Sequence, residues 1–470
     1  MSSYETIPEH FWDPYSKPLA VPGETAGRTY VQVTPTTSLG GSFNGLSQIS
    51  YIYQNPSTYV DLANSFIEAS FKIVKANGTD YGAGDQVSLV REPVFFRQAN
   101  LQIGGSSVEV QSSYQVPVQW LRKLVKTSQA VKQGQGTADL SYPDIVNVPA
   151  NEVDWPAANL GSQLVALTPL AGNADAEVAT NNPAYNPANV LRRQRTGASR
   201  LASFRIPLSS IFSFVHESTP CFWGGSIQIS LMPAAAADLI FNKADNTAYL
   251  QCSQCVLYMA TRTARVDVQA RLLREAALGT KTKYQWLSAD CPQVISVANG
   301  AASMNATITM GNISPQYLAL IFRPASYVDQ SSMNQVALPP KTIISSIPYS
   351  SASVSYAGQQ LPTYSYGSAG NADLLRLYEA FKDMCGQTAE DGAGCYVPFD
   401  QFISQQFVTV FDLRGRSPEA APASVPSNTC TIQANFRSGM TAAANCYVIA
   451  FGVKEAEWAF STNGVAITCQ

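Results

Sequence analysis

The chain has 470 residues, of which 13% are charged and 46% are hydrophobic, whereas soluble domains usually carry about 25% charged residues. This composition excludes an intrinsically disordered chain, which needs low hydrophobicity and high charge. No run of about 20 apolar residues is present, so we expect no membrane span. The acidic N-terminus has no apolar signal-peptide core. At roughly 100–200 residues per domain the length allows two to four domains, in a soluble protein made without secretion.

The charge balance argues against binding of nucleic acid. Lys and Arg number 30 against 33 Asp and Glu, a net charge of −3, and a nucleic-acid-binding surface needs a basic field. The densest basic cluster lies in a polar region rich in Asn and Pro and consists of Arg192, Arg193, Arg195, Arg200 and Arg205. We interpret this cluster as a solvated loop or a subunit contact, and we expect no specific nucleic-acid binding.

Groups for metal or acid–base chemistry are scarce. The two histidines are His10 and His216, and neither has the context of a Ser–His–Asp site. The nine cysteines are odd in number and lack the spacing of a disulfide framework. Cys252 and Cys255 have zinc-knuckle spacing, but no second pair follows, and strand alternation would point their thiols to opposite faces. We therefore expect free buried thiols, no metal site and no cofactor.

Sequence motifs of known catalytic sites are also missing. The glycine-rich stretch 39–45 is not a GxSxG elbow between strand and helix, and no GxxxxGK[ST] phosphate loop occurs. We expect Asp238, Asp400 and Asp412 in turns or strands rather than as a glycosidase pair. Three sequons, which matter only in a secreted protein, begin at Asn77, Asn305 and Asn312. We predict no catalytic residues and a protein that is not an enzyme.

Alternating apolar residues predict many half-buried strands separated by Gly and Pro. Clear examples are 67–73, 227–231 and 432–436. Many such short strands predict an all-β sandwich or barrel. Two short helices interrupt this pattern, because Pro117–Thr127 and Asn371–Met384 carry apolar residues at helical spacing.

The two halves of the chain repeat one order of elements. A glycine turn at 104–105 precedes the first helix, and a second turn at 357–358 precedes the second helix, with an offset of 254 residues from Gly104 to Gly358. The strand at Ile227 recurs at Ile432, an offset of 205 residues, so the first half carries 49 more residues between helix and strand. We interpret the halves as two copies of one β unit.

The additional residues of the first half coincide with a segment rich in Asn, Pro, Ala and Gly at 131–200. This composition is typical of a long loop, which we expect to be inserted in the first copy. The charge-dense segment 262–280 is the longest apparent connection between strand patterns, and we expect the boundary between the two copies there.

Several segments, taken together, resemble the sequences of one protein family. The segment 51–78 contains Tyr59-Val60-Asp61-Leu62. The hairpin and helix at 90–125 contain Tyr114, Trp120 and Leu124 in order. The second half contains the segment 314–324 and Phe411-Asp412-Leu413. This collinear set, with 204–214 as the segment that returns from the long loop of the first half, resembles the double-jelly-roll major capsid proteins of the Polinton, adintovirus, virophage and adenovirus-hexon group. The first half departs from it, with Arg205-Ile206-Pro207-Leu208 where the second half has Phe-Asp-Leu.

The resemblance implies an all-β fold of two tandem eight-stranded jelly rolls with short helices and long loops. It implies an extended arm at 1–28, a first jelly roll at 29–265 with a tower loop near 131–200, and a second at 266–470. It further implies a homotrimer that forms a pseudo-hexagonal capsomer of an icosahedral virion shell. Neighbouring capsomers, penton or vertex proteins and minor capsid proteins are the implied partners.

The composition fits an assembly protein, because low charge and short polar side chains reduce the desolvation cost when large surfaces meet. Tyrosines beside Pro and Gly, such as Tyr364 and Tyr366, are candidate interface residues, and Phe11, Trp12 and Tyr15 suit an arm along a neighbouring subunit. Two alternatives remain at this point. One is a carbohydrate-binding β-sandwich protein or glycosidase, and the other is a minor capsid or vertex protein with a single jelly roll.

Overall fold

We describe the protein from a computed structural model. The structure describes residues 25–54, 58–82, 85, 87–126, 135–141, 187–218, 221–223, 225–242, 247–264, 270, 274, 281–310, 313–325, 349–367, 371–385, 397, 399, 402, 407–414, 429–437, 439–440, 443–461 and 464–469. The expected arm at 1–28 lies outside these residues except for 25–28, which belong to a strand. Of the expected loop at 131–200, only 135–141 and 187–200 are described.

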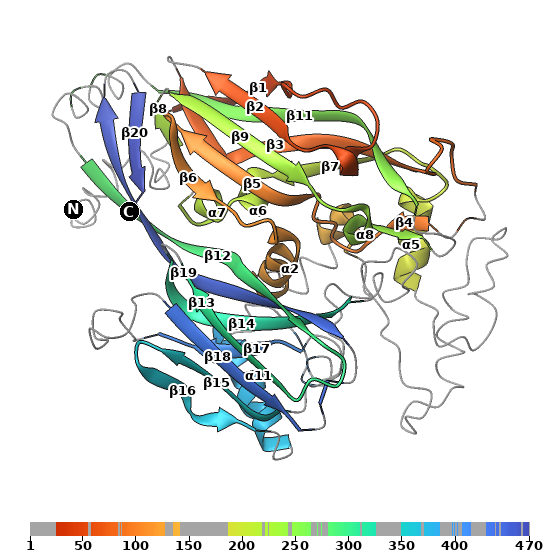
Figure 1. Ribbon diagram of the computed structural model, residues 1–470. Helices are drawn as coiled ribbons and strands as arrows, with labels where there is room; N and C mark the ends of the chain where they lie inside the picture. The colour runs from red at the N-terminus through yellow and green to blue at the C-terminus, as the bar shows by residue number, and fades with distance from the viewer. Residues whose placement is uncertain are drawn as a thin grey trace.

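The first half of the chain forms two antiparallel sheets (Figure 1). One has the order β1 (Thr25–Val33), β11 (Tyr249–Ala264), β3 (Tyr59–Val74) and β7 (Ala202–Pro207), with β8 (Cys221–Trp223) also paired to β3. The other has the order β2 (Ile49–Gln54), β9 (Ser226–Pro233), β5 (Phe96–Ile103) and β6 (Ser106–Val110). A short pair, β4 (Val87–Leu89) and β10 (Ile240–Asn242), stands apart. These sheets enclose the first barrel.

The second half repeats the order of strands in the two four-stranded sheets. One sheet has the order β12 (Lys281–Val297), β19 (Ala444–Ser461), β14 (Ser314–Pro324) and β17 (Thr409–Asp412), with β20 (Gly464–Cys469) paired to β19. The other has the order β13 (Ser303–Thr309), β18 (Thr429–Phe436), β15 (Tyr349–Tyr356) and β16 (Gln359–Tyr366). Each half is therefore a jelly roll of two four-stranded sheets, which confirms the predicted all-β double jelly roll and its internal repeat.

The helices among the described residues are short and lie between strands. They are η1 (Phe43–Gly45), α2 (Gln115–Lys126), η2 (Gln135–Asp139), α5 (Pro187–Thr196), α6 (Leu208–Ile211), α7 (Ser213–Ser218), α8 (Ala236–Leu239) and α11 (Asn371–Met384). The helix predicted from Pro117 begins two residues earlier, and α11 has its predicted bounds. Both predicted turns are confirmed, since Gly104, Gly105, Ala357 and Gly358 have φ of 59°, 83°, 50° and 75°, the left-handed backbone of a two-residue hairpin loop.

Helix α2 lies between the two barrels and contributes to both hydrophobic cores (Figure 1). Val116 and Trp120 pack in the first core. The opposite side of the helix packs in the second core through Val118, Leu121, Leu124 and Val125. Because each of these side chains is at most 7% exposed, α2 is an internal helix of the junction rather than a surface helix with one apolar stripe.

The long strands of the second barrel reach across the same junction. Trp286 of β12 and Ala456 of β19 belong to the first core, and the Trp286 ring meets the Phe214 ring edge-on at 5.1 Å. Strand β20 contacts β5, β6 and β8 of the first barrel. The apolar contacts made by both halves therefore hold the barrels side by side.

An ion pair between described residues crosses this junction. The Arg323 Nη1 atom of β14 lies 2.7 Å from the Asp238 Oδ1 atom of α8, and the two side chains are 11% and 18% exposed. The Arg323 guanidinium also lies 5.5 Å from the Trp120 ring of α2. A charge with so little solvent is stable only with its partner in place.

We predict that Asp238→Asn destabilises the protein by about 3 kcal/mol, because it leaves the Arg323 charge buried without a counter-charge. Urea unfolding followed by tryptophan fluorescence measures this effect. Asp80→Asn is the matched control, since Asp80 forms a solvent-exposed pair with Lys72 at 2.6 Å and should cost at most about 1 kcal/mol. Equal effects of the two substitutions would contradict the prediction.

Candidate functional site

The residues considered for metal and acid–base chemistry do not gather in space. Within the described part of the chain, no group of three or more His, Cys, Asp or Glu residues could hold a metal ion. His216 is at the end of α7, where its Nε2 atom lies 3.8 Å from Glu217 and its side chain is 45% exposed. His10 and Asp400 lie outside the described residues. Asp238 forms the ion pair with Arg323 at the junction between the barrels. Asp412 forms an exposed ion pair with Arg414 at 2.7 Å.

The arginine cluster is not a single solvated loop. Helix α5 forms over Arg192, Arg193 and Arg195, and the Arg192 side chain is completely buried. The Arg195 Nη1 atom donates to the Thr137 carbonyl at 2.6 Å. Arg205 lies on β7, with its guanidinium 3.8 Å from the Phe66 ring. The interpretation as a solvated loop was therefore wrong for Arg192, because the local helix turns it inward.

The thiols of Cys252 and Cys255 do not point to opposite faces as predicted. A β-bulge between Cys252 and Gln254 adds one residue to β11, and this shifts the alternation of side chains. Both cysteines therefore enter the first core, where they are 6% and 0% exposed. The Tyr51 Oη atom lies 3.0 Å from the Cys255 Sγ atom, and burial raises the pKa of Tyr51. Both thiols are free and serve core packing.

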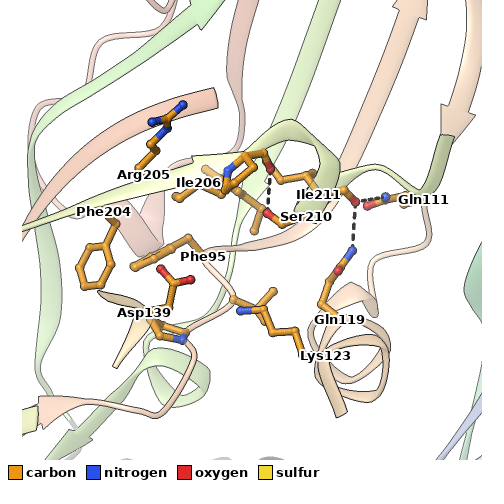
Figure 2. Close-up of a pocket in the computed structure, with 14 residues that line it drawn as sticks. Phe95, Gln111, Gln119, Lys123, Asp139, Phe204, Arg205, Ile206, Ser210 and Ile211 are labelled. Carbon is orange, nitrogen blue, oxygen red and sulfur yellow. Dashed lines mark hydrogen bonds between the residues drawn. The ribbon is translucent and has the colours of Figure 1, made fainter. Parts of the chain in front are cut away.

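A cavity of about 150 Å³ lies between β7 and α2 (Figure 2). Phe95 and Phe204 form part of its apolar wall, and Lys123 and Asp139 lie below the β7 residues in this view. The Ile211 carbonyl at its side accepts hydrogen bonds from Gln111 and Gln119, whose side-chain amides are therefore occupied. The lining suits an apolar group, but it contains no nucleophile paired with a base.

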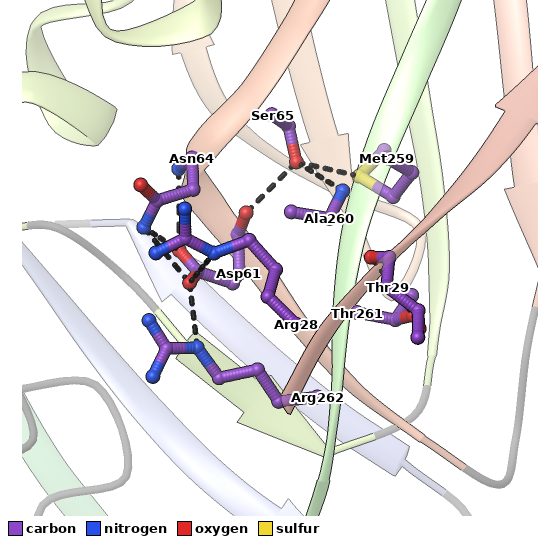
Figure 3. Close-up of polar contacts among 9 residues, drawn as sticks. All are labelled: Arg28, Thr29, Asp61, Asn64, Ser65, Met259, Ala260, Thr261 and Arg262. Atoms are coloured by element: carbon purple, nitrogen blue, oxygen red, sulfur yellow. Dashed lines mark hydrogen bonds and ion pairs between the residues drawn. The ribbon is translucent and has the colours of Figure 1, made fainter. Parts of the chain in front are cut away.

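A buried carboxylate holds the end of the first barrel together (Figure 3). The Asp61 side chain is 4% exposed, and its Oδ2 atom accepts a hydrogen bond from Arg262 Nε at 2.7 Å. It also accepts hydrogen bonds from the Asn64 side chain, and Arg28 Nε lies 3.9 Å away. Asp61 thus joins β3 to β1 and β11. Its place in the Tyr59–Leu62 motif reflects an ion pair within the fold rather than catalysis.

The first barrel has an open sheet face with aromatic side chains. The Phe66 ring stacks on the Tyr258 ring at 5.1 Å and meets the Tyr30 ring at 5.5 Å. Tyr30 is 43% exposed, and the Arg205 guanidinium covers Phe66 from β7. We call Tyr30, Phe66, Tyr258 and Arg205 the open sheet face. Sequence patterns did not identify it, because its members come from four strands.

The expected interface tyrosines differ from one another. Tyr364 is 80% exposed, as an interface residue of a single chain should be. Tyr366 is 6% exposed and donates a hydrogen bond to the Val410 carbonyl at 3.2 Å. The interface prediction was therefore wrong for Tyr366, because an irregularity in the pairing of β16, which places Tyr366 opposite Ala352 but Leu361 opposite Val354, turns it into the second core. Among the described residues, no helix is both long and apolar enough to cross a lipid bilayer.

Comparison with known proteins identifies the fold. No family model and no curated protein sequence matches the chain. The crystal structure of the mavirus major capsid protein matches with a TM-score of 0.52 and 11% identity, over 94% of this chain and 90% of that one. A chain of the Sputnik virophage structure gives 0.53 and 13%, over 95% and 89%. The Faustovirus major capsid protein gives 0.50 and 11%, over 92% and 90%.

These similarities extend over nearly the whole of each chain, so they concern both barrels together and not one shared domain. Identities of this size establish the fold alone. The chain has the double-jelly-roll fold found in the viral major capsid proteins of mavirus and Faustovirus, which confirms the structural side of the resemblance.

We predict that Asp61→Asn destabilises the protein by about 2–4 kcal/mol, because it leaves the half-buried Arg262 without its carboxylate. Asp412→Asn, at the other aspartate of a strand motif, should cost at most about 1 kcal/mol because that pair is exposed. Denaturant midpoints of the two variants measure the difference. A larger effect at Asp412 would refute the assignment.

Alkaline pH should destabilise the fold through its buried thiols. Burial raises the pKa of Cys430 from 9.0 to about 12, so between these values the unfolded chain loses a proton that the folded chain keeps. The stabilisation is complete below pH 9 and is lost as pH rises toward 12, with a slope of about 1.4 kcal/mol per pH unit for each such thiol. Cys430→Val should reduce this slope in denaturation measured from pH 9 to 11. An unchanged slope would disprove the prediction.

Proposed function

We propose that this chain is a viral major capsid protein, a structural subunit of a virion shell. The observation that carries the proposal is the pair of complete, strand-for-strand equivalent jelly rolls, joined through one shared helix and similar in fold to capsid proteins over nearly their full length. A shell protein acts through its surfaces, and this role fits the carboxylates of Asp61 and Asp238, which form ion pairs within the fold.

The proposed building block is a homotrimer. Three chains with two equivalent barrels each present six similar barrels around a threefold axis, so the trimer fills a pseudo-hexagonal position in an icosahedral lattice. Homo-oligomers with closed symmetry are the usual outcome when identical chains associate. A trimer needs two similar barrels in each chain to fill six positions, whereas a monomeric binding protein has no need of a duplicated barrel.

The proposed division of the chain is an arm at 1–28, a first jelly roll at 29–265 with a tower loop near 131–200, and a second jelly roll at 266–470. Its support is that strand pairing, among the described residues, stays within each half, with β11 ending at Ala264 and β12 beginning at Lys281. Neighbouring capsomers, vertex proteins and minor capsid proteins are the partners that this role requires, and the virion shell is its location.

The purified protein should have a mass near 150 kDa by light scattering, three times the chain mass of 50.5 kDa. Obligate interfaces of about 2,000–5,000 Å2 keep such assemblies together at micromolar concentration. A monomer that binds glycans would instead support a carbohydrate-binding β-sandwich protein. A fivefold oligomer would support a vertex protein, and either result would refute the proposal.

A further inference from the structure

The proposed shell role does not use the cavity between β7 and α2, which has an aromatic wall (Figure 2). The Phe95 and Phe204 rings that line it lie 5.0 Å apart and are tilted against each other. The Phe71 ring stacks on Phe95 at 4.6 Å, so the wall is fixed by packing in the first core. A cavity of about 150 Å³ has the size that holds one benzene ring, and aromatic rings favour edge-on or offset contacts with one another.

The neutral polar side chains of the lining are engaged within the fold. Gln111 and Gln119 donate hydrogen bonds to one backbone carbonyl of α6 at 2.8 and 3.0 Å. The Gln119 Oε1 atom accepts a hydrogen bond from Arg122 at 3.3 Å, and the Ser210 hydroxyl donates to the Pro207 carbonyl at 2.7 Å. The polar group of a ligand is therefore left with the charged side chains of the lining.

Lys123 of α2 is half-buried in the lining and has hydrogen-bond donors to offer. Its Nζ atom donates a hydrogen bond to the Glu92 carbonyl at 3.3 Å, which uses one of the three N–H donors of an ammonium group. Figure 2 shows Lys123 on the side of the cavity opposite Ile206 and Ser210, where Asp139 also lies. The Lys123 ammonium is therefore positioned to bind an acceptor at the polar end of an apolar ligand.

The charges around the cavity favour an anion. Besides Lys123, Arg205 lines the cavity from β7, and the Arg195 guanidinium lies 6.0 Å from the Phe204 ring of the wall. The acidic residue of the lining is Asp139, which is exposed to solvent. Because water and salt screen exposed charges, Asp139 repels a bound anion less than the cationic side chains attract it.

We propose that this cavity binds a small aromatic carboxylate, with its ring against Phe95 and Phe204 and its carboxylate paired with Lys123. Such a pair is a charge-assisted hydrogen bond, which is stronger than a bond between neutral groups. The inference goes beyond the shell role and does not depend on it, because the cavity lies within one chain. Elements of the first barrel and α2 line the same cavity, so a ligand that binds only the folded chain stabilises the contact between them.

Calorimetric titration of the full-length protein with four probes tests the ligand class. Sodium benzoate should bind with a Kd of about 1 mM or below, as expected for a ligand of this size, and should raise the melting temperature. Benzyl alcohol has the ring without the charge and should bind about tenfold more weakly. Sodium acetate lacks the ring and benzylamine brings a cation to Lys123. Benzylamine that binds as tightly as benzoate, or acetate that does, would overturn the proposal.

Three variants locate the site. Lys123→Met keeps the apolar stem and removes the charge, so it should weaken benzoate binding about tenfold or more and affect benzyl alcohol much less. Ile206→Trp, at a half-buried position of the lining, should fill the cavity and abolish binding of both probes. Lys382→Met is the matched control and should bind benzoate as the native chain does, because Lys382 lies on α11, 24% exposed and paired with Glu379. Thermal unfolding checks that each variant is folded.

Benzoate binding that does not saturate would refute the inference, as would equal binding by the native chain and both lining variants. If Lys123→Met does not fold, Ile206→Trp still decides whether this cavity is the site, and the ranking of the probes needs no variant. The mass of the protein judges the shell role separately. A trimer that does not bind benzoate refutes only this inference, and a monomer that binds it refutes only the shell role.

Discussion

The architecture depends on one helix that is apolar on two sides. Helix α2 places Trp120 in the first core and Leu121 in the second, so neither barrel can bury its own surface fully without the other. Burial of large apolar side chains is worth about 1.5–3 kcal/mol each, and six of them lie on this helix. The ion pair of Arg323 with Asp238 then fixes the direction in which the barrels pack.

The duplicated barrels are equivalent in topology but not in surroundings. Strand β14 of the second barrel is buried on both faces from Leu318 to Phe322, whereas its counterpart β3 in the first barrel alternates and carries Phe66 of the open sheet face.

Local features of the sequence predicted much of this fold. Glycine turns at Gly105 and Gly358, alternation along strands and the bounds of α11 all follow from interactions among neighbouring residues. Features that depend on distant residues could not be predicted in this way. The bulge beside Cys252 reverses the orientation of Cys255, the burial of Arg192 depends on helix α5, and the Arg323–Asp238 pair joins residues with no local signal.

The central claim is that two similar barrels in each chain allow a trimer to present six barrels and so to occupy a position of sixfold symmetry in a shell. A cryo-electron microscopy reconstruction of the purified protein tests it most directly. The account predicts six barrel densities around a threefold axis, with helix α2 between the two barrels of each chain. Isolated particles with only two barrels, or a ring in which barrels of the same kind face one another, would contradict it.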